Sequence, residues 1–278
     1  MNGLRILSID HRVPLIELAD RLGAPRERLA AFKSLVVDAA LDVAGGRDGF
    51  GLFMDGGYGA AAIAKARAAG LWVARPIDRP HARPLRFEED GDVAEALARW
   101  PADVVVKCAV YLHPADAPDM LAGADRALAA LHQACERAGR DLLLEVLSSP
   151  HGPVDETTVA TLIARIYRLG VRPRWWLIED QPRPSGWRRC GDAARAHDPG
   201  RAEFLTIART IKDFPEVSAS ALSEPLAAGF CAGRCMFAAA IEPWLRGEMA
   251  DAEAVQAMAA NFAAVVAAWD APRAHPVA

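Results

Sequence analysis

Charged side chains stand inside short apolar segments of this sequence, where a solvated charge is not expected. Lys107 lies in the middle of VVVKCAV, Glu145 lies inside LLLEVL, and Asp10 ends the segment LRILSID. An unpaired ammonium or carboxylate buried in such a segment costs several kcal/mol. Lys107 and Glu145 could therefore pair as a structural salt bridge. Alternatively, a lysine in a dry pocket has a lowered pKa, and its free amine can form a Schiff base with a ketone.

Polar residues also follow other apolar segments, and we predict that they bind substrate. They are His11, Arg12, Asp55, Arg75, His113, Glu179, Gly233 and Arg234. Each could instead cap a helix or form an ordinary salt bridge. Gly233 and Arg234 give the more specific signal, because glycine permits close backbone approach and arginine offers a planar fork for an oxyanion.

Eight short apolar segments could position these residues. They cover 4–10, 50–55, 71–75, 104–110, 142–147, 175–179, 204–208 and 229–233. Most of them lack polar alternation, which is typical of strands buried on both faces of a parallel sheet.

The stretches between these segments are long enough for helices. One of them has apolar side chains at helical spacing over 159–169, between Asp155 as a plausible N-cap and Gly170 as a stop.

This order predicts an α/β fold, a single-domain (β/α)8 TIM barrel over residues 1–278 with a flexible tail over 270–278. Strand ends of such a barrel converge on one mouth, and phosphate sites are frequent at its seventh and eighth strands. A doubly wound dinucleotide-binding fold is the competitor. It needs a glycine-rich turn after the first strand, and DHRVPL supplies none.

Composition narrows the partners. The 278 residues carry 32 basic and 36 acidic side chains, a net charge of −4, which argues against nucleic acid or an anionic membrane as a partner. The sequence shows no leader pattern and nothing near 18 consecutive apolar residues, so we expect no membrane span. Five cysteines without a CxxC pair need not form disulfides in a core of this size. We expect a cytoplasmic protein with a small-molecule substrate, and a homo-oligomer is left open.

Short motifs along the chain resemble one family. They are IDHR at 9–12, FK at 32–33, YG at 58–59, GLW and RP within 70–76, RPLRFE at 83–88, WP at 100–101, VVKC at 105–108, HP at 113–114, LLLEV at 142–146, WW at 175–176, and GF with GR within 229–234. Together they resemble the aldolase-like domain behind the sugar kinase in bacterial 5-dehydro-2-deoxygluconokinases of inositol catabolism. The similarity runs from residue 7 to 269, and the kinase part is absent from this sequence.

The resemblance implies a class I aldolase-type barrel, similar to the tagatose-bisphosphate and 5-dehydro-2-deoxyphosphogluconate aldolases. Such enzymes cleave a ketose phosphate to dihydroxyacetone phosphate and an aldehyde. By the same resemblance, Asp10, Lys107 and Glu145 surround the reacting carbonyl, and Gly233 and Arg234 hold the phosphate.

One position departs from that family. Its Schiff-base lysine follows the tryptophan pair of the sixth strand, and here that position is Leu177 in WWLIED. A leucine cannot form an imine. The second strand departs as well, since Gly56 and Gly57 stand where relatives carry larger polar residues.

Three hypotheses follow for the chemistry. In the first, Lys107 takes over the Schiff base, as the lysine of transaldolase-type barrels does on the fourth strand, and Glu145 or Asp10 moves protons. Only four of the 32 basic residues are lysines, and the other three compete poorly: Lys33 and Lys65 fall in helical patterns, and Lys212 follows the seventh strand.

In the second hypothesis, a divalent metal held by three histidines polarises the carbonyl, although the sequence shows no compact ligand motif. These histidines are His11, His113 and His151. In the third, aldol chemistry is lost, and the chain is another lyase or isomerase, or a sugar-phosphate-binding protein. We assign no metal site and no cofactor.

Overall fold

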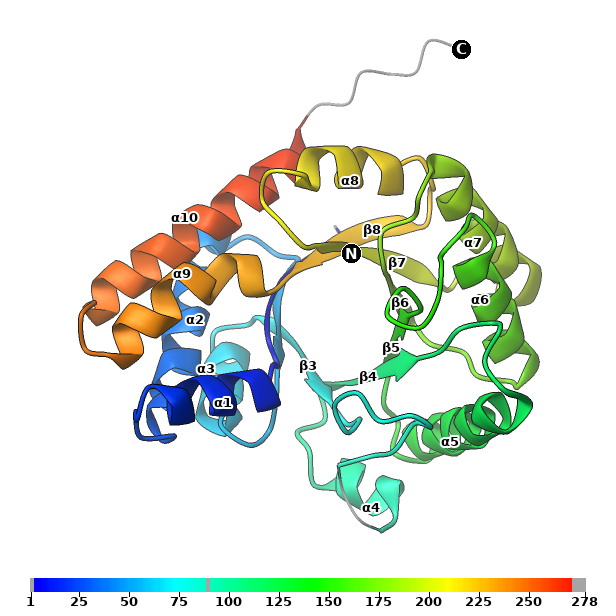
Figure 1. The fold of residues 1–278 in the computed structure, drawn as a ribbon, viewed down its shortest axis with the longest axis horizontal. Helices are drawn as coiled ribbons and strands as arrows, with labels where there is room; N and C mark the ends of the chain where they lie inside the picture. The colour runs from blue at the N-terminus through cyan, green and yellow to red at the C-terminus, as the bar shows by residue number, and fades with distance from the viewer. Residues whose placement is uncertain (1–2, 89–90, 272–278) are drawn as a thin grey trace.

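A closed barrel of parallel strands forms the centre of the molecule (Figure 1). The computed structural model describes residues 3–88 and 91–271. The strands follow chain order around the barrel, and β8 pairs with β1. They are β1 (Leu4–Ile9), β2 (Phe50–Met54), β3 (Trp72–Pro76), β4 (Val105–Tyr111), β5 (Leu142–Leu147), β6 (Trp175–Ile178), β7 (Glu203–Ala208) and β8 (Ala227–Ala232). The predicted (β/α)8 TIM barrel is confirmed, and the strand bounds differ from the predicted ones by at most two residues.

Helices cover the outside of the barrel on all sides (Figure 1). They are α1 (Val13–Arg21), α2 (Arg28–Ala44), α3 (Ala60–Ala68), α4 (Val93–Ala98), α5 (Pro118–Arg137), α6 (Thr158–Arg168), α7 (Pro184–His197), α8 (Phe214–Ala221), α9 (Arg234–Leu245) and α10 (Asp251–Asp270). Each strand is followed by at least one helix, which returns the chain to the other end of the barrel. All the strands are therefore parallel, and their carboxyl ends lie at the same mouth.

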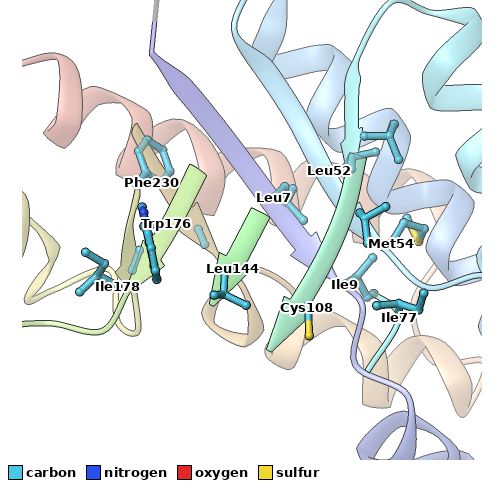
Figure 2. Close-up of a cluster of buried hydrophobic side chains, with 14 of the residues drawn as sticks. Leu7, Ile9, Leu52, Met54, Ile77, Cys108, Leu144, Trp176, Ile178 and Phe230 are labelled. Carbon is cyan, nitrogen blue, oxygen red and sulfur yellow. The ribbon is translucent and has the colours of Figure 1, made fainter. Parts of the chain in front are cut away.

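Apolar side chains alternate between the two faces of the strands. One face packs against the helices, as Leu7, Leu52 and Trp176 do (Figure 2). The other fills the barrel interior with Leu4, Ile6, Phe53, Ala74, Val105, Leu143, Trp175, Leu177, Leu205 and Cys231. These interior residues precede the polar residues on the same strands. The interior is therefore apolar near the amino ends and charged near the mouth.

Helix α6 shows how local sequence sets an element. Its apolar residues are buried on one face, as the spacing predicts. Thr157 is its N-cap residue, and the Asp155 carboxylate accepts hydrogen bonds from the backbone N–H groups of Thr157 and Thr158. Gly170 ends the helix region with φ of 85°, a conformation that glycine adopts without strain.

Helix α10 is long and apolar enough to cross a membrane by length and composition, with mean hydropathy 1.2. A core helix of a soluble protein passes the same test. Its buried residues, Met258, Phe262 and Trp269 among them, pack in the same apolar cluster as the outer faces of the strands. Of its apolar 18-residue window, 33% is buried in the fold. The predicted flexible tail lies outside the described residues from 272 onward.

Candidate active site

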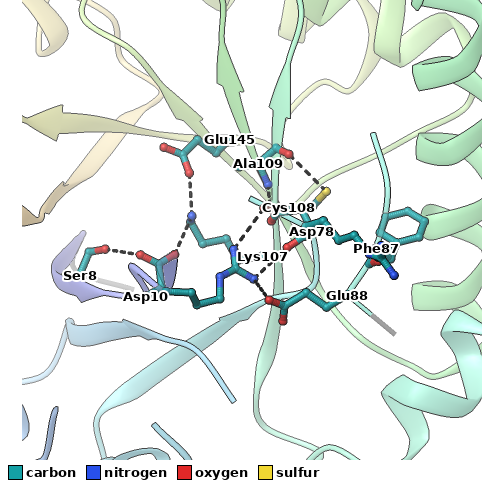
Figure 3. A network of polar contacts seen from close by, with 11 residues as sticks. Ser8, Asp10, Asp78, Phe87, Glu88, Lys107, Cys108, Ala109 and Glu145 are labelled. Atoms are coloured by element: carbon teal, nitrogen blue, oxygen red, sulfur yellow. Dashed lines mark hydrogen bonds and ion pairs between the residues drawn. The ribbon is translucent and has the colours of Figure 1, made fainter. Parts of the chain in front are cut away.

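Lys107 is the centre of a charged cluster in the barrel interior (Figure 3). Its Nζ lies 2.9 Å from Asp10 Oδ2 and 2.6 Å from Glu145 Oε2. Strands β1 and β4 are not neighbours in the barrel, so the contact with Asp10 crosses the interior. The Phe53 ring lies below the ammonium, 5.1 Å from its centroid to Nζ. The structure thus brings together the three residues predicted to be catalytic.

The cluster is buried but reaches solvent. The side chain of Lys107 is 6% exposed, while those of Asp10 and Glu145 are 11% and 14% exposed. Ser8 Oγ donates a 2.8 Å hydrogen bond to the other oxygen of Asp10. Asp10 is thereby held in one orientation, with one oxygen on a hydroxyl and the other on the ammonium.

Of the two alternatives that the sequence left open for Lys107, the structure shows the salt bridge with Glu145 and not the lowered pKa. Burial by itself lowers the pKa of Lys107, but the carboxylates of Asp10 and Glu145 outweigh it and raise that pKa well above the ordinary value. Burial raises the pKa of Glu145, and the Lys107 charge offsets part of this. Burial opposes ionisation of Asp10 as well, yet Lys107 and His11 keep its pKa below the ordinary value. The resting lysine is therefore an ammonium, and the alternative of a lowered pKa is wrong because two carboxylates face the lysine.

Arg12 joins the mouth to the loop after β3. Its guanidinium donates to the backbone oxygen of Asp78 at 2.8 Å and pairs with Glu88 at 2.6 Å. Asp78 is buried, and its Oδ1 accepts a 2.9 Å hydrogen bond from the Ala109 N–H on β4. Arg12 and Asp78 together fix the loop that borders the Lys107 cluster.

The eighth strand delivers Gly233 and Arg234 to the mouth. Gly233 is the N-cap of α9, and Arg234 is the exposed first residue of that helix. A side chain on Gly233 would meet the His11 ring at 3.3 Å. The ring of His11 packs edge-on against Phe237, and its buried Nδ1 has no hydrogen-bond partner. A helix N-terminus, an arginine and an imidazole thus lie side by side, a combination suited to an anion.

Other predicted site residues have structural partners. Buried Glu179 accepts hydrogen bonds from the backbone N–H groups of Ser148 and Ser149, at 2.7 and 3.0 Å. Asp55 pairs with Lys33 of α2 and accepts from the Tyr58 N–H at 3.0 Å. These carboxylates hold the loops after β5 and β2.

Arg75 and His113 are also engaged in packing. The Arg75 guanidinium lies 4.2 Å from the centroid of the Trp100 ring, on the helix-facing side of β3. A side chain at Gly56 would lie 2.2 Å from that guanidinium, which explains the glycine there. His113 has one ring nitrogen 3.1 Å from Pro153 O and accepts from the Ala115 N–H with the other.

Leu177 lies next to Glu145 in register on β6 and is 1% exposed. It packs in the interior apolar cluster with Leu143 and Leu205. The position where the resembled family keeps its lysine is therefore filled by a packing residue.

Metal ligation finds no support in the geometry. Within residues 3–88 and 91–271, no group of three or more His, Cys, Asp or Glu side chains is placed to hold a metal ion. His11 packs on Phe237, His113 is tied to the loop after β5, and His151 packs against Tyr111 at 6.0 Å between ring centroids. The three histidines do not converge.

Sequence reasoning missed two buried charged residues near the mouth, Asp78 and Lys33. Asp78 follows β3 in a loop without periodicity, so no pattern could reveal it. Lys33 carried a signal, because apolar residues stand four positions before it and three and four positions after it, at 29, 36 and 37. A lysine at that place on a helix faces the core.

Comparison with known proteins agrees with this fold. A fructose-bisphosphate aldolase from Plasmodium falciparum, solved with TRAP and an inhibitor, matches with TM-score 0.70 at 12% identity, over 97% of this chain and 91% of that one. A fructose-bisphosphate aldolase from Slackia heliotrinireducens matches with TM-score 0.57 at 12% identity, over 92% and 85%. A Corynebacterium glutamicum protein from a structural genomics effort matches with TM-score 0.57 at 18% identity, over 94% and 85%. At such identities the likeness concerns the fold.

Among curated protein sequences, no match to this chain was found. A family model does match, and it covers residues 1–273. The chain therefore belongs to the family described as uncharacterized protein conserved in bacteria (DUF2090).

Proposed function

We propose that this protein is an aldolase-like carbon–carbon lyase acting on a ketose phosphate or a phosphorylated keto-deoxy sugar acid. The observation that carries the proposal is the Lys107 ammonium between Asp10 and Glu145 at the mouth of an aldolase-like barrel. Support comes also from the sequence motifs that resemble the kinase-linked aldolase-like domain. Both point to chemistry at a substrate carbonyl.

The first proton transfer follows from the geometry. Nζ of Lys107 must lose a proton before it can attack a ketone carbon. Glu145 is the acceptor, since it lies 2.6 Å away and burial raises its pKa. Attack forms a carbinolamine, and the protonated Glu145 returns its proton to the departing hydroxyl, which leaves as water. Asp10 stays ionised and stabilises the cationic imine.

Carbon–carbon cleavage then uses the imine as an electron sink. A nearby carboxylate removes the proton of the substrate hydroxyl two carbons from the imine carbon, and that hydroxyl oxygen becomes the aldehyde carbonyl. The bond between the two intervening carbons breaks, and its electron pair forms the double bond of an enamine on Lys107. The phosphate of the substrate would bind at Gly233 and Arg234, where α9 begins. The ring of His11 borders that position. It is neutral at pH 7, because burial lowers its pKa to about 4.

A second candidate is favoured by the raised pKa of Lys107 and by Leu177. In it, Lys107 remains an ammonium and polarises the substrate carbonyl without a covalent bond, while Glu145 moves the proton. The product would be that of an isomerase or of another lyase, and an inert version would only bind the sugar phosphate.

Borohydride trapping separates the two candidates. The protein is incubated with dihydroxyacetone phosphate and a panel of ketose phosphates, reduced with borohydride and weighed by intact mass spectrometry. We expect one reduced adduct in the wild type, located at Lys107 by peptide mapping, and none in Lys107→Met. Lys65→Met is the matched control, since Lys65 is a half-exposed lysine on α3.

An adduct that persists in Lys107→Met contradicts the imine at Lys107. No adduct in a wild-type protein that still converts a substrate would support the non-covalent candidate. If no substrate is converted but dihydroxyacetone phosphate raises the melting temperature, the protein binds sugar phosphates without lyase activity.

A further inference from the structure

Lys33 is a second buried lysine, and it lies behind the strands that carry the cluster. It comes from α2, is 1% exposed, and donates a 2.5 Å hydrogen bond to the carbonyl oxygen of Ile9. It also forms an ion pair with Asp55. Ile9 is the last residue of β1, and Asp55 directly follows β2. One ammonium thus joins the carboxyl ends of two neighbouring strands.

The position of the held carbonyl gives this contact its meaning. The Ile9 carbonyl belongs to the peptide group that links Ile9 to Asp10. A donor fixed on that oxygen sets the orientation of the peptide plane from which the Asp10 side chain departs. Asp10 then contacts Ser8 and Lys107 at 2.8 and 2.9 Å. The contacts run without interruption from Asp55 through Lys33 to the Lys107 cluster.

Stability alone does not account for a buried ion pair at this place. Replacement of such pairs by neutral side chains of similar volume is often neutral or stabilising for a fold. Asp55 is fixed independently, because its other carboxylate oxygen accepts the Tyr58 N–H. The Lys33–Asp55 pair therefore serves to fix the relative position of the strand ends, because a buried polar pair in an apolar layer can favour one arrangement of the chain.

Lys33 does not serve as the nucleophile. Its side chain is 1% exposed and its Nζ is engaged by the Ile9 carbonyl and Asp55. It packs beneath the strand ends on the helix-facing side, so a ketone has no approach to it.

We infer that Lys33 is a positioning residue: together with Asp55 it clamps the ends of β1 and β2 and holds Asp10 in contact with Lys107. The part of this inference that concerns catalysis rests on the proposed function. The part that concerns the Asp10–Lys107 contact does not.

The test uses the double variant Lys33→Met/Asp55→Asn in the full-length protein. Methionine retains the bulk of the lysine stem, and asparagine retains an acceptor for the Tyr58 N–H. We expect a folded protein with a melting temperature within about 4 °C of wild type. Its crystal structure should show the Asp10–Lys107 contact broken, and trapping with dihydroxyacetone phosphate should slow by about tenfold to a hundredfold. The pH dependence of the trapping rate should shift, because Asp10 no longer assists Lys107.

A matched control removes another ion pair with a buried carboxylate. Arg195 pairs with Glu224, whose side chain is 0% exposed, in the turn before β8 at the opposite end of the barrel. In Arg195→Met/Glu224→Gln the Asp10–Lys107 contact, the trapping rate and its pH profile should match those of the wild type.

The outcomes separate the two proposals. A folded Lys33→Met/Asp55→Asn protein that keeps the Asp10–Lys107 contact overturns the positioning role, whatever its activity. A broken contact supports that role even if the wild type forms no adduct, in which case only the proposed imine fails. Should the double variant not fold, Asp55→Asn alone is the milder test. It should lengthen the Asp10–Lys107 distance and slow trapping about threefold if the clamp acts as inferred, and a wild-type distance and rate would overturn the inference.

Discussion

The two buried lysines of this barrel occupy contrasting environments. Lys107 faces the interior between two carboxylates, whereas Lys33 lies behind the strands with one carboxylate and one backbone oxygen. Burial lowers the pKa of Lys33, and Asp55 offsets only part of that effect. For Lys107 the two carboxylates outweigh burial, and its pKa is raised. Burial alone therefore does not tell which lysine is an unprotonated amine, because the number of carboxylates that face a lysine determines the direction of its pKa shift.

The same contrast separates access from reactivity. Lys33 has the pKa direction that suits a nucleophile but no path for a substrate. Lys107 has the position but starts as an ammonium, so its use as a nucleophile requires proton transfer to Glu145. An active amine here would be created by the reaction sequence and not by the resting protein.

The largest difference is expected when each lysine loses its charge. Lys107→Met leaves two carboxylates facing each other, and Lys33→Met leaves only Asp55. We expect Lys107→Met to lower the free energy of unfolding by about 5 kcal/mol and Lys33→Met by about 3 kcal/mol. Urea denaturation at pH 7 measures both. An equal or reversed order would mean that Asp10 and Glu145 relieve each other by protonation or solvent contact.

His11, whose pKa both lysines lower, offers the next test. Burial lowers the pKa of His11 to about 4, against 6.5 for an ordinary histidine; Asp10 opposes this, while Arg234, Lys107 and Lys33 add to it. Between pH 6.5 and 4 the unfolded chain is thus protonated at His11, whereas the folded protein is not. His11 contributes stability above pH 6.5 that is lost as pH falls through 4, up to about 3 kcal/mol.

His11→Gln should flatten the acid limb of stability by that amount. Urea denaturation of wild type and variant at pH 7, 5.5 and 4 isolates the histidine, because the carboxylates titrate in both proteins. Titration of the His11 ring protons by NMR checks the same value directly. A midpoint near 6.5 would show that the ring is hydrated at the mouth and not shielded.

Much of the architecture was predictable and part of the site was not. Short apolar segments separated by helical stretches located each strand, because strands that are buried on both faces contain few polar residues. Lys107 and Glu145 were recognisable since each interrupts such a run, and Asp10 since it ends one. Asp78 and the Lys33 clamp depend on contacts between distant elements, and the raised pKa of Lys107 depends on the distances to two carboxylates. Neither is encoded in local spacing.

At alkaline pH the contributions of the two lysines to the free energy of unfolding should change in opposite directions as pH rises. With the pKa of Lys33 below the ordinary value of 10.5, the unfolded chain binds more protons just under that pH, so this residue makes stability rise with pH there. With the pKa of Lys107 above 10.5, its contribution is complete below that pH and is lost as pH rises further. Each effect amounts to about 1.4 kcal/mol per pKa unit.

Comparison of each lysine variant with wild type reveals these slopes. As pH rises toward 10.5 the stability deficit of Lys33→Met should grow, while that of Lys107→Met stays constant and shrinks only above pH 10.5. Two deficits that change in parallel would contradict the opposite pKa shifts.

The smallest expected effect lies at Leu177, within the interior and beside Glu145 in register. If Leu177 only packs, Leu177→Met should change the free energy of unfolding by less than about 1.5 kcal/mol, since the two side chains have similar volume. Trapping at Lys107 should keep its wild-type rate and pH dependence. A large loss of trapping in Leu177→Met would mean that this leucine shapes the pocket around the imine. The reactivity of the charged cluster would then depend on the packing of the apolar interior below it. A negligible loss would instead leave Lys107 and its two carboxylates as a self-contained unit.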